Sequence, residues 1–102
     1  MGLSKVDVFV GQLQFLEGDA NCLTDLLPIL NQLAADLVEV PCSQYGMAML
    51  PLFRRCMLDI NALALPIETA ERDSLLDVLY RLGELVGIPR ESFYLEAWRG
   101  DW

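Results

Sequence analysis

The chain has 102 residues, of which 54% are apolar, and 15 acidic against 7 basic side chains give it a net charge of −8. This length is typical of one domain, so we expect residues 1–102 to form a single domain. The negative charge disfavours binding to nucleic acid and to anionic membranes, because proteins bind both through Lys and Arg. A domain this small has little interior, so we expect a second copy, in a homodimer, or a partner protein to cover part of the apolar surface.

Residues 4–17 predict either a short helix or a β-hairpin. Apolar residues at helical spacing follow Ser4, which can cap a helix that has Asp7 in its first turn. The alternative is a hairpin that turns after Val10, because every second residue is a valine at Val6, Val8 and Val10. We favour the helix.

A second helix is predicted from Asn21 or Thr24 to Glu39. Leucines recur there with the 3.6-residue period of a helix that is buried along one side. A start at Thr24 would place Pro28 near the first turn, where proline is tolerated, whereas a start at Asn21 would put a kink at Pro28. In either case Pro41 ends the helix.

Residues 43–65 predict a third helix, in which apolar side chains cover more than one face. One stripe consists of Leu50, Phe53, Met57, Ile60 and Ala64, and a second of Met49, Leu52, Cys56 and Leu63. A helix that is apolar around most of its circumference is buried on most of it. We therefore expect either the central helix of a bundle or a helix that also packs on another chain.

Two further helices are predicted over residues 69–86 and 89–99. Thr69 is the expected N-cap of the first, and Gly87 stands where a C′ glycine ends a helix. Pro89 suits the first position of the second helix. The sequence therefore predicts an all-α fold, a small bundle of four to five helices with short turns.

The sequence offers no pattern typical of catalysis or metal binding. It contains no histidine, and Cys22, Cys42 and Cys56 lack both the close spacing of a metal site and the pairing of a disulfide framework. We expect no enzyme activity, no cofactor and no metal, and cysteines that pack as small apolar residues. With no signal peptide and no membrane-length apolar run, we expect a reduced, cytoplasmic protein.

The triplet Asp73-Ser74-Leu75, in an acidic helical chain, resembles the phosphopantetheine attachment site of acyl carrier proteins. The resemblance implies an exposed serine at the start of a helix, near the middle of the chain. Here Ser74 falls inside the helix predicted from residue 69, and well past the middle of the chain, so the triplet departs from the family pattern.

Residues 82–93 resemble a helix-turn-helix element. Gly87 takes the place of the turn glycine, and Ile88 and Phe93 occupy apolar positions on either side of the second helix start. The resemblance implies DNA binding by that second helix. It would carry Arg90 but also Glu91 and Glu96, which repel phosphates.

We therefore expect a non-catalytic regulatory or inhibitory protein that binds and occludes a partner protein, as an anti-activator that sequesters a transcription regulator does. Immunity proteins and secretion chaperones are alternatives. Methionines adapt to varied partners, and Tyr, Trp and Arg are enriched among interface anchors. The expected interface comprises Met47, Met49, Leu50, Leu52, Phe53, Arg54, Arg55, Cys56, Leu63, Tyr94, Trp98 and Trp102.

Overall fold

The computed structural model describes residues 4–100 and 102, and it confirms the predicted all-α fold. The helices are α1 (Lys5–Gly11), α2 (Ala20–Glu39), α3 (Leu50–Ala62) and α4 (Thr69–Leu85). Shorter 3₁₀ turns accompany them: η1 (Gln12–Phe15), η2 (Cys42–Gln44), η3 (Met47–Met49), η4 (Arg90–Ser92) and η5 (Tyr94–Trp98).

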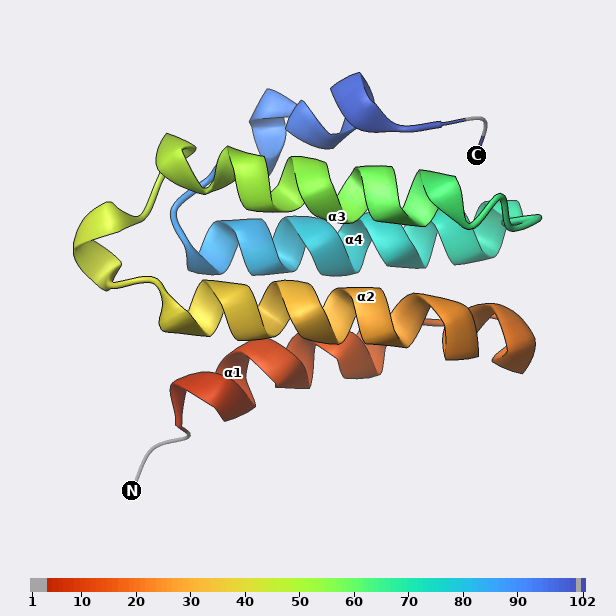
Figure 1. Ribbon diagram of the computed structural model, residues 1–102, viewed down its shortest axis with the longest axis horizontal. Coiled ribbons are helices and arrows are strands. Elements are labelled where there is room, and N and C mark those ends of the chain that lie inside the picture. The colour runs from red at the N-terminus through yellow and green to blue at the C-terminus, as the bar shows by residue number, and fades with distance from the viewer. Residues whose placement is uncertain (1–3, 101) are drawn as a thin grey trace.

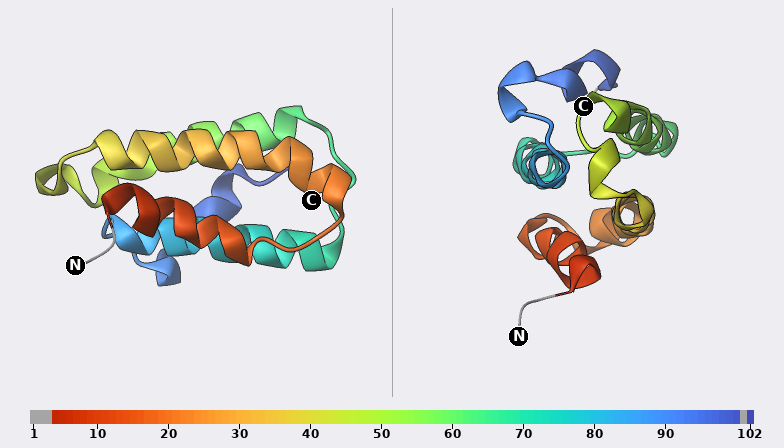
Figure 2. Two further views of the ribbon diagram at one scale, coloured as in Figure 1. Left: turned by 90° about the horizontal axis from the view of Figure 1, so that it is seen from below. Right: turned by 90° about the vertical axis from the view of Figure 1, so that its left-hand side faces the viewer.

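Successive helices run in opposite directions along the long axis of the molecule (Figure 1). Helix α2 packs against α1 and α3, while η1 contacts α4. The C-terminal segment lies across α3 and α4, on the side of the bundle away from α1, as the end-on view of Figure 2 shows. Its turns η4 and η5 contact α4 and α3, respectively. The segment therefore covers α3 and α4 from outside the bundle, and its described residues form 3₁₀ turns and no α-helix.

The predicted leucine stripes meet in one apolar core. In α2 and α4 the buried leucines recur with the predicted helical spacing, and α3 buries one of its sides against the core. The largest buried side chains of these three helices include Leu26, Leu30, Leu33, Leu37, Phe53, Met57, Ile60, Leu75, Leu79 and Leu82. A radius of gyration of 13.1 Å is that of a compact chain of about 100 residues. Burial of these side chains is the main source of stability.

The helix predicted at residues 4–17 is confirmed, and the hairpin alternative is wrong. The Ser4 hydroxyl accepts a hydrogen bond from the Asp7 N–H at 3.1 Å, which caps α1 as expected. After Gly11 the chain continues as η1. Val6 and Val10 are exposed, whereas Phe9 and Leu13 are buried, so the burial follows a helical period and not an alternating one.

Helix α2 starts earlier than either predicted residue. Asp19 is the N-cap, and its carboxylate accepts from the Asn21 N–H at 3.1 Å. Thr24 is inside the helix, where its hydroxyl donates to the Ala20 carbonyl at 2.8 Å. Pro28 therefore lies well within α2, on an exposed face where its missing N–H removes one helical hydrogen bond.

The third predicted helix is shorter than residues 43–65 because its first part is folded as η2 and η3. Gly46 separates these turns with φ +110°, a conformation that favours glycine. Its N–H donates to the Val86 carbonyl at 2.7 Å, which ties this turn to the end of α4. Pro51 lies in the first turn of α3, where its missing N–H breaks no helical hydrogen bond.

Helix α4 is capped by Glu68 and not by Thr69, which is its first residue. The Glu71 carboxylate accepts from the Glu68 N–H at 3.0 Å, so the cap is made by a side chain three residues into the helix. The predicted C-terminal glycine is confirmed. Gly87 has φ +84°, and the Ile88 N–H donates to the Gly83 carbonyl at 2.9 Å, as in a Schellman motif.

The fifth helix predicted over residues 89–99 is wrong. Pro89 precedes η4, and Phe93, with φ 49°, separates η4 from η5. The left-handed backbone at Phe93 interrupts the helical path, so the segment forms two short turns. Tyr94 and Leu95 are buried against the bundle, while Phe93 stays exposed.

Candidate protein-binding surface

Four of the twelve residues expected at an interface belong to the core. Met49, Phe53, Cys56 and Tyr94 have exposed fractions of 4%, 0%, 3% and 9%, so they are not available to a partner on the folded chain. Met49, Phe53 and Cys56 are buried because both stripes of the predicted third helix face into this bundle, and Tyr94 is buried because its ring packs on Phe53. A substitution such as Met49→Asp would therefore test folding and not binding.

Four other expected residues come together at one groove. Leu50, Arg54, Arg55 and Trp98 line an open hollow of about 440 Å³ between α3 and η5. Its remaining lining residues were not predicted: Pro51, Leu58 and Asp59. We call this feature, defined by these seven residues, the α3 groove.

The remaining expected residues lie elsewhere on the surface. Met47 and Leu63 are exposed just outside the two ends of α3. Leu52 is half-buried and lines, with Ile29, a smaller hollow between α2 and α3 that shares Arg55 and Asp59 with the α3 groove. Trp102 lines a hollow at the far end of α3, beside Pro66. The expected interface is thus divided among several places, of which the α3 groove gathers the most.

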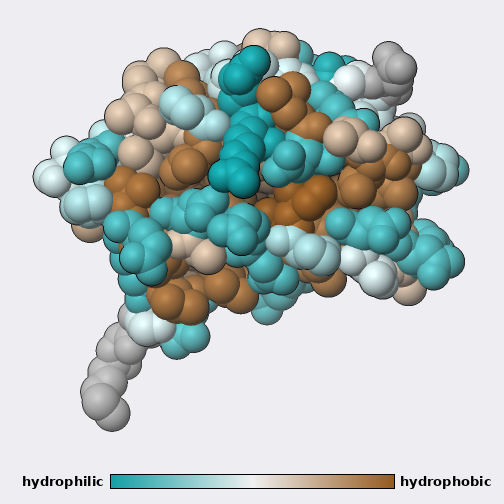
Figure 3. All heavy atoms as spheres, viewed as in Figure 1, coloured by the Kyte–Doolittle hydropathy of each residue, from teal (hydrophilic) through white to brown (hydrophobic). Residues whose placement is uncertain are grey.

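The α3 groove lies on a face where apolar and charged side chains alternate. Figure 3 shows apolar patches interrupted by strongly hydrophilic side chains on the side of the molecule that carries α3 and the C-terminal segment. Leu58, in the groove, is exposed to 42% although it is a large apolar residue. The groove therefore combines apolar walls with charges at its rim.

Arg54 and Arg55 differ from the other arginines of the chain. Within residues 4–100 and 102, Arg72, Arg81, Arg90 and Arg99 each pair with a carboxylate, at 2.8–3.4 Å. Neither Arg54 nor Arg55 forms an ion pair with that part of the chain, and both are exposed. The α3 groove thus carries two positive charges that the described fold does not use.

Asn61 holds the C-terminal segment that forms the second wall of the α3 groove. Its side-chain nitrogen donates to the Trp98 carbonyl at 2.8 Å, and its Oδ1 accepts from the Gly100 N–H at 3.1 Å and from Trp102 Nε1 at 2.7 Å. The sequence does not indicate this role. Its only signal is a polar amide next to the apolar Ile60, and that pattern does not reveal the partners of Asn61.

Aromatic packing fixes Trp98 from the other side. The Tyr94 ring packs edge-on against Phe53, Tyr80 and Trp98, with centroid distances of 5.6, 5.3 and 6.3 Å. Gly83 makes room for the Tyr94 ring, because a Cβ at that position would overlap the Tyr94 hydroxyl. The wall of the groove is therefore anchored in the core and is not a loose tail.

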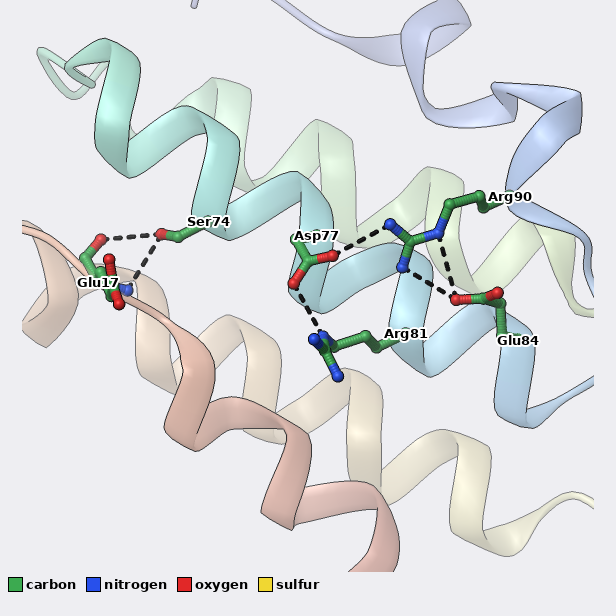
Figure 4. Close-up of polar contacts among 6 residues, drawn as sticks. All are labelled: Glu17, Ser74, Asp77, Arg81, Glu84 and Arg90. Atoms are coloured by element: carbon green, nitrogen blue, oxygen red, sulfur yellow. Dashed lines mark hydrogen bonds and ion pairs between the residues drawn. The ribbon is translucent and has the colours of Figure 1, made fainter.

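The residues behind the helix-turn-helix resemblance serve the fold. Arg90 reaches back to α4, where it donates to Asp77 at 3.1 Å and to Glu84 at 2.9 Å (Figure 4). Arg81 also donates to Asp77, and these hydrogen bonds hold the pKa of Asp77 below its usual value. Because the segment after Gly87 is 3₁₀ and its arginine is paired with acids, the structure lacks the recognition helix that the resemblance requires.

The structure also argues against the acyl carrier resemblance. Ser74 lies inside α4 and is half-buried, not at an exposed helix start. Its hydroxyl donates to the Glu17 carbonyl at 2.9 Å and accepts from the Glu17 N–H at 3.0 Å (Figure 4). The serine therefore joins the α1–α2 connection to α4.

Among residues 4–100 and 102, no three Cys, Asp or Glu side chains gather as metal ligands. Cys22 and Cys56 are buried, and desolvation raises the pKa of Cys56 to about 12. Cys42 is an exposed free thiol. Of the same residues, no helix is both long enough and apolar enough to cross a bilayer.

Comparison with known proteins adds no family. No protein-family model, no curated protein and no solved structure matches this chain.

Proposed function

We propose that this chain is a non-catalytic regulatory or inhibitory protein that binds a partner protein at the α3 groove and so occludes the partner's functional surface. One observation carries the proposal: the groove joins exposed apolar walls to two arginines that form no ion pair within the described chain. Trp and Arg are enriched among residues that dominate binding energy, and both stand here at one rim.

Occlusion is the mode of action that fits such a surface. Apolar burial supplies affinity at about 25 cal/mol per Å² before the costs of association, and rim charges select the partner and raise the association rate. Anti-activators, immunity proteins and secretion chaperones all act in this way. We propose a protein partner and not nucleic acid, because the chain carries a net charge of −8.

The test compares two exposed apolar residues on opposite sides of the bundle. Leu58→Asp places a charge in the α3 groove, whereas Val10→Asp places the same charge on α1, at a residue of similar exposure, 39% against 42%. Affinity capture from the native cell, quantified by mass spectrometry, should recover a protein with the wild type and with Val10→Asp, and lose it with Leu58→Asp. Circular dichroism and thermal unfolding check that both variants fold.

Two results would contradict the proposal. If a captured protein is recovered equally with the wild type, Val10→Asp and Leu58→Asp, it binds outside the α3 groove. If no captured protein is lost with Leu58→Asp, the groove has no protein partner in that cell. Light scattering on the purified chain tests the homodimer separately: a dimer mass that falls to a monomer with Leu58→Asp would show that a second copy covers this surface.

A further inference from the structure

We propose that the segment received by the α3 groove is short, acidic and apolar, with a carboxylate beside Arg54 and Arg55 and an apolar side chain against Leu58 and Trp98. This inference rests on the proposed function and adds the chemistry of the partner. It can fail while the proposed function holds, because a partner could bind the same groove through uncharged or basic residues.

Charge complementarity indicates a carboxylate. The chain has 15 acidic side chains for 7 basic ones, yet Arg54 and Arg55 have no carboxylate partner among the described residues. Asp59 lines the same groove one turn further along α3 and pairs with neither arginine. Guanidinium groups bind carboxylates through paired hydrogen bonds, which makes an acidic side chain the natural ligand for this rim.

Stability of the helix does not explain where these arginines are. Cations stabilise a helix near its C-terminus, but Arg54 and Arg55 lie in the N-terminal half of α3, and its last turn contains no basic residue. Exposed arginines on this half of the helix gain nothing from the helix dipole. Neither an ion pair within the described residues nor the helix dipole accounts for their position.

The shape and lining of the groove determine the size of the ligand and the position of its apolar side chain. Leu50, Pro51, Leu58 and Trp98 supply apolar walls, and a volume of about 440 Å³ accommodates a few side chains, not a folded domain. Asp59 repels a carboxylate at the far end of the groove. We therefore expect the acidic residue of the ligand near the start of α3 and its apolar residue towards Leu58.

A second copy of this chain is a less suitable occupant than a segment of another protein. Two copies would each carry a charge of −8, and their mutual repulsion opposes association. A short segment brings few charges of its own and meets the two arginines directly.

The experiment selects ligands from a random peptide library displayed on phage, with the full-length chain as bait. Three baits are compared: the wild type, the double charge reversal Arg54→Glu with Arg55→Glu, and Arg72→Glu as a control for a charge reversal outside the groove. Arg72 is a surface arginine of α4, not of α3; it is paired with Asp73 at 3.3 Å and does not line the groove. The enriched peptides are then synthesised, and their affinities for all three baits are measured by fluorescence anisotropy.

We expect the wild type and Arg72→Glu to enrich peptides in which Asp or Glu stands close to Leu, Phe or Trp. The double reversal should weaken those peptides about tenfold or more and should enrich Lys or Arg instead. The inference is overturned if no peptide is enriched, if the enriched peptides carry no acidic bias, or if the double reversal leaves their affinity unchanged. The capture experiment separates the two proposals. If Leu58→Asp loses a captured partner but the peptide selection gives any of these three results, the proposed function stands and only the acidic character of the ligand is rejected.

Discussion

Gly83→Ala is predicted to destabilise the protein, although alanine is ordinarily the better residue within a helix. Gly83 is buried inside α4, where the exchange alone would stabilise by about 1 kcal/mol. A Cβ at this position overlaps the Tyr94 hydroxyl oxygen and lies 3.2 Å from Tyr94 Cζ. The ring cannot move aside freely, because Phe53, Tyr80 and Trp98 surround it.

The magnitude follows from two opposing terms. Forcing extra volume into a packed core costs about 1–3 kcal/mol, against the gain of about 1 kcal/mol in helix propensity. We therefore expect the free energy of unfolding to fall by up to about 2 kcal/mol. Tyr94→Phe removes a buried hydroxyl that has no hydrogen-bond partner in the described chain, so by itself it should be neutral or mildly stabilising.

Urea and thermal unfolding of the two single variants and the double variant test this reasoning as a double-mutant cycle. In the Tyr94→Phe background the overlap with the hydroxyl is gone, and the cost of Gly83→Ala should fall by at least about 1 kcal/mol, or about 4–8 °C in Tm. Gly11→Ala is the control, since nothing lies within 4 Å of a Cβ there. If Gly83→Ala stabilises the wild-type chain, or if the coupling energy is below about 0.5 kcal/mol, Tyr94 does not pack against Gly83.

Two further predictions concern the polar contacts that join distant parts of the chain. Hydrogen bonds from backbone N–H groups hold the pKa of Glu71 below its usual value, so its contribution to stability is present above the ordinary glutamate pKa and is lost as pH falls through the lower, folded value. Urea unfolding between about pH 3 and pH 6 should show that the free energy of unfolding falls less steeply with decreasing pH in Glu71→Gln than in the wild type. Glu91→Gln, at an exposed position, is the control and should follow the wild type. Identical slopes for all three proteins would refute the contribution of the Glu71 carboxylate. Asn61→Ala, made in a Trp98→Phe background so that Trp102 alone reports, should shift the tryptophan emission to longer wavelength and increase quenching by acrylamide, because the indole loses its hydrogen bond to Asn61. An unchanged spectrum would show that Asn61 does not hold this segment in solution.

Local spacing was enough to predict most of the helical fold. The period of the leucines in α2 and α4 specifies which side of each helix is buried, and Gly87 specifies where α4 ends, because only a residue tolerant of positive φ completes that turn. Ser4 identified the start of α1 for a similar reason, since its hydroxyl satisfies a free N–H of the first turn. These features depend on neighbours within a few residues.

The surface depended on contacts between residues that are far apart in sequence. Nothing near Phe53 in the chain shows that Tyr94 will cover it, so a stripe that looked available for a partner became core. The hydrogen bond that holds the groove wall joins Asn61 to Trp98 across 37 positions. Arg54 and Arg55 stand out only once the partners of the other arginines are known. The sequence by itself determined the helices and their buried faces, because these follow from local periodicity; only the tertiary structure decided which apolar residues stay exposed, because that depends on what the rest of the chain brings against them.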